Sequence, residues 1–269
     1  NLVRVLQAQT ARQVGLIDHA VVARGEAAIR ERIAALREQG VSIAIVDAVS
    51  NDDLLRLGPA LRDMALVTAG SGVAIALPAN FGIAPSSQAA VLPPASGLKA
   101  IVSGSCSVAT NQQVMHFIQS GRPALAIDPL RIAAGVDVCA EALAWAGDKI
   151  AGGPVLIYST ADTSAVKSIQ SKLGVEAAGT LVEQTIAGIA RGLVELGVRQ
   201  LVVAGGETSG ACVQALEIAQ MRIGGQIDPG VPWCHALSPA APDGLHITLK
   251  SGNFGTADFF TKAFAACAA

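Results

Sequence analysis

The segment RQLVVAGGETSGACVQALEIA, residues 199–219, places a strand, a glycine-rich turn and a helix in immediate succession. Residues 201–204 form a short apolar run of the kind that a buried parallel strand needs. The turn from Gly205 to Gly210 follows directly, and the apolar positions within residues 211–218 predict a helix. The turn therefore lies where free backbone N–H groups and the positive end of the helix dipole favour an anion.

The same turn carries residues that suit a phosphate group. Gly205 and Gly206 let the backbone approach an anion, and Thr208 and Ser209 add hydroxyl groups for phosphate or for hydrated Mg²⁺. Glu207 is a candidate for orienting metal-bound water. No Gly-x-x-x-x-Gly-Lys-Ser/Thr occurs, so this is not a Walker loop. A tight turn in any α/β protein also needs glycine, and this segment alone leaves both interpretations open.

The composition is that of an α/β protein. Of the 269 residues, 51% are hydrophobic, which suits central strands that are covered on both faces. No apolar run approaches the roughly 18 residues that a membrane-spanning helix needs. The formal net charge is −2 and the basic residues are scattered, so we expect neither a membrane nor a nucleic acid as a partner.

The five cysteines stand at wide spacings, without a Cys-x-x-Cys pair or a zinc-binding pattern. This usage predicts a reduced, cytoplasmic protein and no metal site built from these residues. Cys106 stands between two serines as a candidate nucleophile, but without a local histidine a small buried thiol is the favoured interpretation. The chain starts at Asn1 without a signal sequence, and we expect it to be a piece of a longer protein.

Alternating strand and helix patterns predict two α/β domains, each a mostly parallel sheet flanked by helices. Strands are expected over residues 14–17, 41–47, 65–68, 99–102, 124–127, 154–158, 201–204, 222–228 and 245–250. Residues 229–241 are expected to be irregular, and the Pro, Gly and Ser of residues 78–99 predict a linker. We therefore expect a first domain over residues 1–85 and a second, Rossmann-like nucleotide-binding domain over residues 98–264.

Three loops rich in Gly and Ser follow expected strands of the second domain, at residues 103–107, 205–209 and 251–255. The carboxyl ends of parallel strands share one edge of a sheet, so such loops can meet on one polyanionic ligand. The candidate contacts outside the central loop are Ser103, Ser105, Gly252 and Asn253. Lys250 ends the last strand and is the natural point charge for a phosphate, although a surface lysine at a strand end is equally ordinary.

The first domain holds weaker candidates for a substrate site. Asp47 stands at the carboxyl end of an expected strand, where ligands meet open parallel sheets. Gly70-Ser71-Gly72 either binds an anion at a helix start or only turns the chain. The acidic residues 52–53 are interpreted as helix caps rather than as a catalytic base.

Three blocks of the chain resemble the four-carbon acid sugar kinase family. They are SGSCSVATNQQ (residues 103–113), GGETSG (205–210) and LKSGNFGTADFF (249–260), and their order and spacing match. The resemblance covers essentially the whole chain, since residues 1–80 are similar to the later part of the family's amino-terminal substrate-binding domain. The family's amino-terminal Asp-Asp-Phe-Thr-Gly-Ala segment, which helps to form the substrate site, has no counterpart in this sequence.

The resemblance implies an ATP-dependent kinase of a small-molecule sugar acid, such as threonate, erythronate or 3-oxo-tetronate, with ATP and Mg²⁺ as cofactors. ATP would contact Ser103, the Gly205 to Thr208 turn and the Gly252 loop. The catalytic base, the stereochemistry of the substrate and the oligomeric state, a homo-oligomer included, stay open. The alternatives are a non-catalytic sugar-acid-binding or sensor module and a dinucleotide-dependent oxidoreductase. The sequence lacks the Gly-x-Gly-x-x-Gly fingerprint that a dinucleotide-dependent oxidoreductase would be expected to carry.

Overall fold

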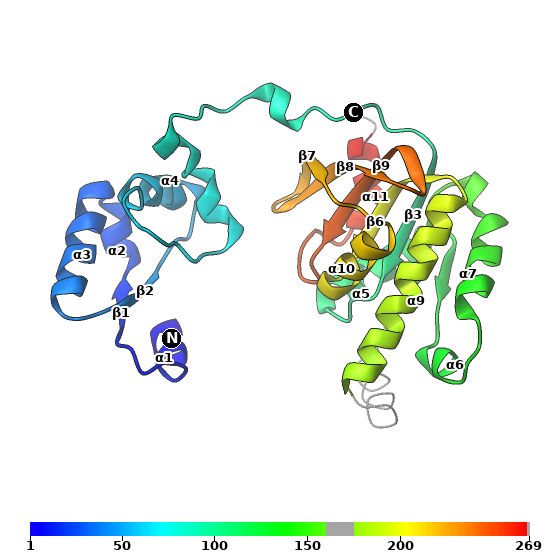
Figure 1. The fold of residues 1–269 in the computed structure, drawn as a ribbon, viewed down its shortest axis with the longest axis horizontal. Helices are drawn as coiled ribbons and strands as arrows, with labels where there is room; N and C mark the ends of the chain where they lie inside the picture. Colours follow the sequence, from blue (N-terminus) through cyan, green and yellow to red (C-terminus); the bar gives the residue numbers. More distant parts are fainter. Residues whose placement is uncertain (160–174, 268–269) are drawn as a thin grey trace. The chain divides into compact units, whose positions relative to one another are not determined.

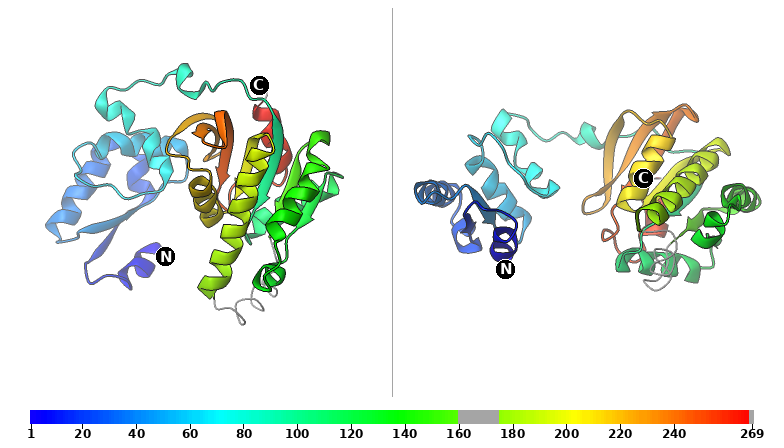
Figure 2. Two further views of the ribbon diagram at one scale, coloured as in Figure 1. Left: turned by 45° about the vertical axis from the view of Figure 1, so that its right-hand side comes forward. Right: turned by 60° about the horizontal axis from the view of Figure 1, so that its bottom comes forward.

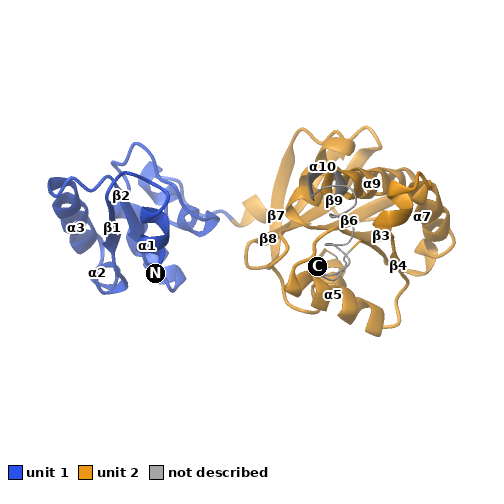
Figure 3. Cartoon of the chain, turned by 90° about the horizontal axis from the view of Figure 1, so that it is seen from below, with its two compact units in different colours: residues 1–86 blue, residues 87–269 orange. Residues whose placement is uncertain are grey.

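The computed structural model of the protein describes residues 1–159 and 175–267, and the chain divides into two compact units (Figures 1 and 3). Unit 1 covers Asn1–Ser86 and unit 2 covers Ser87–Ala269. Within the described residues, no helix is long and apolar enough to cross a membrane.

Unit 1 is built on two short parallel strands, β1 (Val14–Ile17) and β2 (Ile43–Val46), paired from Val14 with Ile43 to Ile17 with Val46. Four helices accompany them: α1 (Leu2–Gln7), α2 (His19–Ala23), α3 (Glu26–Glu38) and α4 (Asn51–Ala60). Apolar side chains of the strands and of α2, α3 and α4 form one core. The strands predicted from residues 14–17 and 41–47 are therefore confirmed.

The start of α4 confirms one cap interpretation. Ser50 is the N-cap and forms a capping box with Asp53, whose carboxylate accepts hydrogen bonds from the backbone of Val49 and Ser50. The Val49 N–H bond is the main reason that the pKa of Asp53 is lowered. Asp53 is 1% exposed, and its carboxylate caps the first turn of the helix, as expected of a cap residue.

The predicted strand over residues 65–68 is wrong. These residues have no regular structure, and two short 3₁₀ helices follow, η1 (Ser71–Ile75) and η2 (Pro78–Phe81). Three apolar residues and a threonine are too short a signal to distinguish a strand from an irregular segment, and these residues are mostly exposed.

Unit 2 holds one seven-stranded sheet in the order β4-β5-β3-β6-β9-β8-β7. The strands are β3 (Leu98–Ser103), β4 (Ala124–Ala126), β5 (Val155–Tyr158), β6 (Val198–Ala204), β7 (Met221–Asp228), β8 (Val231–Ser238) and β9 (Ala241–Lys250). The first five strands in this order are parallel, whereas β8 is antiparallel to both of its neighbours. The predicted α/β class and mostly parallel sheet are confirmed.

The expectation that residues 229–241 are irregular is wrong, because β8 occupies most of them. The strand follows a tight turn at Gly230, and Pro232 falls at a register irregularity, where a missing N–H group is tolerated. Trp233 anchors the strand, because its side chain is buried and its indole N–H donates to the carbonyl of Ala263 at 2.8 Å. The proline and the turn residues weaken the local strand signal, so the antiparallel hairpin was not predicted from the sequence.

Helices cover both faces of this sheet (Figures 1 and 2). They are α5 (Val108–Gln119), α6 (Pro129–Ala133), α7 (Val138–Gly147), α9 (Val175–Glu195), α10 (Gly206–Ala215) and α11 (Phe259–Cys267), with the short turns η3 (Ser87–Ala90) and η4 (Ile150–Gly152). Figure 3 shows α9 and α10 on one face and α5 on the other. Alternate residues of β3 serve the two layers, since Val102 joins the core of α7 and α9 and Ile101 joins that of α5 and α11.

Candidate functional site

The three Gly/Ser loops of unit 2 lie side by side at one edge of the sheet. Ser103 at the end of β3 pairs with Ala204 at the end of β6, and Ala204 pairs with Lys250 at the end of β9. The strands thus end in one row, and each loop leaves the sheet at the same level. The structure brings together the three loops that the sequence proposed.

Backbone hydrogen bonds continue from the strands into the loops. The N–H of Gly104 donates to the carbonyl of Ala204 at 3.0 Å, and the N–H of Gly205 donates to the carbonyl of Lys250 at 2.8 Å. The Gly205 N–H is therefore used within the sheet and is not a donor for a ligand. The next three N–H groups, of residues 206–208, belong to the first turn of α10 and have no partner inside a helix.

Thr208 fits closely between two of the glycines. A Cβ atom on Gly104 would collide with Thr208 Oγ1, and one on Gly205 would lie 2.7 Å from it. Gly205 also has φ +127, which L side chains rarely adopt. Thr208 is 3% exposed, so its side chain packs between the first two loops and holds them together.

A cluster of hydroxyl groups joins the first loop to the third. Ser107 Oγ and Thr110 Oγ1 both donate to the carbonyl of Gly252, Thr110 at 2.9 Å. Ser105 Oγ donates to Ser107 Oγ at 3.3 Å, and a Cβ atom on Gly252 would lie 2.7 Å from Ser105 Oγ. The two loops, more than 140 residues apart in sequence, therefore touch without room for a larger residue at position 252.

The predicted contact residues differ in exposure. Gly206, Glu207 and Asn253 are exposed, and Ser105 and Gly252 are half-buried. Ser103 is fully buried, and the hydroxyl of buried Ser209 donates to the Gly205 carbonyl at 2.6 Å within α10. The Ser209 hydroxyl is thus engaged inside the helix, and the open surface of the site consists of the α10 start and the 251–255 loop.

Lys250 is fully buried, unlike the surface lysine that the sequence allowed. Its Nζ donates to Thr110 Oγ1 at 2.9 Å and to the carbonyls of Ser251 and Gly252 at 3.0 and 3.1 Å. Burial lowers the pKa of Lys250 to about 8.

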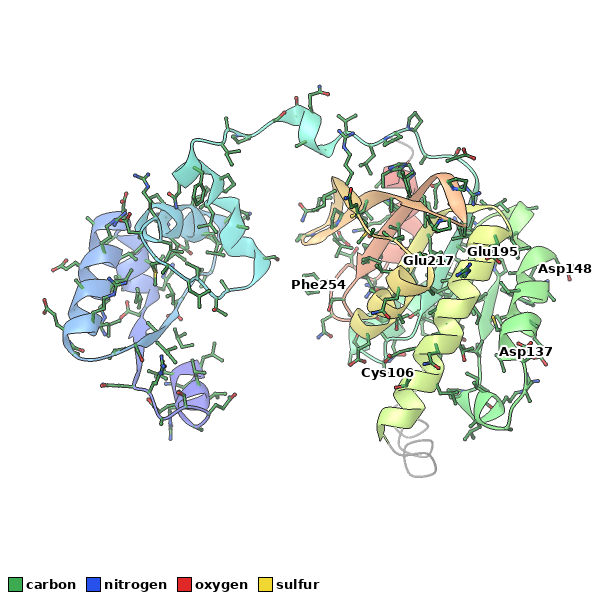
Figure 4. The ribbon with its side chains drawn as sticks, in the orientation of Figure 1. Cys106, Asp137, Asp148, Glu195, Glu217 and Phe254 are labelled. Carbon is green, nitrogen blue, oxygen red and sulfur yellow. The ribbon has the colours of Figure 1, made fainter. Side chains whose placement is uncertain are left out.

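Gln113 is a site residue that local sequence reasoning missed. It is fully buried on α5, and its Nε2 donates to the carbonyls of Phe254, Gly255 and Thr256. The signal was its position one helical turn after Thr110, which puts both side chains on the face that meets the third loop. Phe254 itself is 44% exposed on that loop (Figure 4).

Two further side chains stand near the loops. Glu183 of α9 is half-buried, and its pKa is raised by burial and by the charge of Glu207, which is also its hydrogen-bond partner. Cys106 is exposed in the loop after β3, so the interpretation of a buried thiol is wrong (Figure 4). The pair of carboxylates, Glu183 and Glu207, was not predicted from the sequence because the two residues lie on different helices and no short motif joins them.

The candidates of unit 1 lie in two places, after β2 and at the start of η1. The Asp47 N–H donates to the Ile17 carbonyl at 3.0 Å, which places Asp47 just past the carboxyl end of β2. Gly70 and Gly72 line a cavity of about 770 Å³ together with β2 and α4, whereas Asp47 and Ser71 do not line it. The cavity wall is mostly apolar, and the basic residues in it are Arg12 and Arg37.

Two family models match separate parts of the chain. A model described as a nucleotide-binding C-terminal domain matches residues 100–260, and one described as a sugar-binding N-terminal domain matches residues 1–77. The chain is 51% identical to the 3-oxo-tetronate kinase of Pseudomonas fluorescens, over 98% of this chain and 61% of that protein. It is 52% identical to the 3-oxo-tetronate kinase of Burkholderia multivorans, over 99% of this chain and 62% of that protein.

A crystal structure of a Salmonella typhimurium LT2 protein matches with a TM-score of 0.75 and 37% identity, over 97% of this chain and 62% of that chain. The chain thus spans about three fifths of the length of the curated relatives it matches.

Proposed function

The chain belongs to the four-carbon acid sugar kinase family, and from this we propose that it is the part of an ATP-dependent kinase that binds the nucleotide through unit 2. Unit 1 contributes to binding a four-carbon sugar acid. The named relatives are 3-oxo-tetronate kinases, so 3-oxo-tetronate is the first substrate to test, with threonate and erythronate beside it.

One observation carries the nucleotide assignment. The ends of β3, β6 and β9 stand in one row at Ser103, Ala204 and Lys250, so three glycine-bearing loops surround one position. Ligands of open α/β sheets bind outside the carboxyl ends of the strands, where the strand order changes direction. The order β5-β3-β6 places this row at such a point, because the chain moves from β3 to one side of the sheet and returns to the other.

The residues of this row have distinct parts in the proposal. The N–H groups of Gly206 and Glu207 at the start of α10 bind phosphate oxygens, because the helix dipole and the free donors both favour negative charge there. Ser103, Ser105 and Thr208 shape the floor, and Gly252 and Asn253 bound the opposite side. Phosphoryl transfer in such a site depends on holding and neutralising the phosphates.

The carboxylates of Glu183 and Glu207 fit a divalent cation in chemistry and charge. Oxygen donors are what Mg²⁺ prefers. The pKa of Glu183 is raised by burial and by the charge of Glu207, and a cation between the two carboxylates would offset their repulsion. When bound with ATP, Mg²⁺ supplies positive charge to the phosphate oxygens. In the proposal these two side chains hold the hydrated ion beside the α10 start.

Glu207→Gln is therefore expected to weaken Mn²⁺ binding, measured by electron paramagnetic resonance with ATP present, by about tenfold. The amide keeps the size of the side chain but removes its charge. Glu195→Gln on the far end of α9 is the matched control, since Glu195 pairs with Arg191 instead. Equal Mn²⁺ affinity in the two variants would contradict the role of Glu207.

In unit 1, Asp47 and the Gly70-Ser71-Gly72 segment are the proposed contacts of the sugar acid. The position of Asp47 past the end of β2 and the cavity beside Gly70 and Gly72 support this part of the proposal. Arg12 and Arg37 add positive charge to the same cavity, which suits a carboxylate substrate. The catalytic base is left unassigned.

Calorimetry with MgATP and, separately, with NAD tests the proposal against its two alternatives. Binding of MgATP but not NAD is expected; binding of neither would favour a sugar-acid sensor, and binding of NAD alone an oxidoreductase. Phosphoryl transfer to a panel of tetronates, run on a chain extended at its amino end, then tests the substrate class.

A further inference from the structure

The loop over residues 251–256 is held from beneath by Lys250 and Gln113. Lys250 Nζ donates to the first two carbonyl oxygens of the loop, at 3.0 and 3.1 Å. Gln113 Nε2 donates to the last three, at 3.0, 3.1 and 3.1 Å. Five of the six carbonyl groups therefore point towards buried donors.

The N–H groups that follow these inward carbonyls consequently face away from the buried donors, whereas the N–H of Phe254 donates to the Ser251 carbonyl. A trans peptide unit is planar, so the N–H that follows an inward carbonyl faces the opposite side. Thr256 shows this, because its N–H follows the inward carbonyl of Gly255 and donates to the Asp228 carboxylate at 2.9 Å. The N–H groups of Gly252 and Asn253 follow inward carbonyls in the same way. These two N–H groups can donate to an anion, as the N–H of Thr256 donates to the Asp228 carboxylate.

Lys250 lacks a counter-ion among the described residues. Its three hydrogen-bond acceptors, Thr110 Oγ1 and two backbone carbonyls, are all neutral, and no ion pair of the described chain includes it. A buried charge without a partner destabilises the folded protein. An anion bound at the outward N–H groups would offset this cost, because the lysine lies directly beneath that loop.

We propose that Lys250 and Gln113 are positioning residues of the nucleotide site, which fix the 251–256 loop with the N–H groups of Gly252 and Asn253 facing the phosphates, and that the bound nucleotide is the counter-ion of Lys250. This inference rests on the proposed function. It differs from the expectation that Lys250 contacts a phosphate, because the three Nζ hydrogen bonds are all made within the protein.

The proposal has a pH dependence with a definite sign. Burial lowers the pKa of Lys250 to about 8 in the free protein, and a bound anion favours the protonated form. Nucleotide affinity is therefore highest below pH 8 and falls as the pH rises through 8. Binding near pH 8 takes up protons, because it raises the pKa of the lysine.

Other titratable groups lie on the elements around Lys250. They include His116, Glu183, Glu207, Asp228, Asp258, Lys262 and Cys106, and also His246 on β9 itself, whose pKa is lowered chiefly by burial. Burial alone would raise the pKa of Asp228, but hydrogen bonds from Lys262 and Thr256 lower it. The pKa of Asp258 is lowered chiefly by its hydrogen bond from Thr256. Both carboxylates therefore stay ionised from pH 7 to 9, and a Cys106→Ser background removes the exposed thiol from the measurement.

The first test measures MgATP affinity of the full 269-residue chain by calorimetry at pH 7, 8 and 9 in buffers of different ionisation enthalpy. The wild type is expected to lose about tenfold in affinity between pH 7 and 9 and to take up protons at pH 8. Lys250→Met is expected to bind at least about tenfold more weakly at pH 7, without pH dependence or proton uptake. The control Lys99→Met, at the opposite end of β3, is expected to match the wild type.

The second test needs no ligand and separates positioning from direct phosphate contact. Hydrogen exchange of the Phe254 and Thr256 amides, which are bonded to the Ser251 carbonyl and to Asp228, reports whether the loop is held. Lys250→Met and Gln113→Leu are both expected to speed this exchange by about tenfold or more in the free chain, and Lys99→Met is not.

The outcomes distinguish this inference from the proposed function. Unchanged amide exchange in both loop variants, or equal MgATP affinity of Lys250→Met and the wild type at pH 7 and 9, would overturn the inference. A wild type that binds no MgATP would reject the proposed function, and the amide exchange would still decide whether the two residues hold the loop.

Discussion

Gly206→Val is expected to weaken MgATP binding by at least about 100-fold while leaving the unfolding transition almost unchanged. Gly206 is the exposed first residue of α10, and a Cβ atom built on it meets no atom within 4 Å. The folded chain therefore accepts a larger side chain there. A phosphate does not, because the valine would stand in front of the first-turn N–H groups that are proposed to bind it.

The matched control is Gly147→Val, the same change at the last residue of α7, where a Cβ atom also meets nothing within 4 Å. It is expected to keep the wild-type affinity. Calorimetry gives the affinities, and circular dichroism during urea unfolding gives the stabilities. Wild-type affinity in Gly206→Val would count heavily against anion binding at the start of α10.

Gly104→Ala is expected to lose nucleotide binding for the opposite reason, because here the methyl group has no room. It would collide with Thr208 Oγ1 and lie 3.1 Å from Ile186 Cδ1, so the first two loops must separate. We expect the free energy of unfolding of unit 2 to fall by about 3 kcal/mol and MgATP affinity to fall by about 100-fold or more.

A double-mutant cycle with Thr208→Ala tests this cause. Removing the threonine hydroxyl takes away the atom that the new methyl group meets, so the double variant should recover at least about 1 kcal/mol relative to the sum of the single changes. Urea unfolding of the four proteins provides the comparison. Strictly additive losses would show that Gly104 and Thr208 do not share one close contact.

Local signals explain what could be predicted from the sequence. The apolar run, the glycine turn and the apolar helix face of residues 199–219 each act over a few residues, and β6 formed where the apolar run indicated. The helix α10 was also predicted, but it begins at Gly206, inside the expected turn, and ends at Ala215. The meeting of the three loops followed from a general property of parallel strands rather than from any one residue. The family resemblance then predicted ATP as the ligand of these loops.

The features that could not be predicted from the sequence depend on tertiary contacts. In the sequence Lys250 is indistinguishable from a surface lysine. Its burial depends on α5, which brings Thr110 within hydrogen-bond distance of Nζ. Gln113 reads as an ordinary polar helix residue, although it holds three carbonyls of a loop about 140 residues later in the chain. The hairpin strand β8 was missed because its proline and turn residues suppress the local strand signal.

The shared carbonyl of Gly252 has a consequence for the order of events during synthesis. Its donors Ser107 and Thr110 leave the ribosome more than 140 residues before it does, and β9 must insert beside β6 before they can meet. A nascent chain that ends before β9 therefore carries only part of the nucleotide site, however well its earlier strands have folded. In the proposed function, ATP stabilises the finished sheet selectively, because only the completed domain offers all three loops.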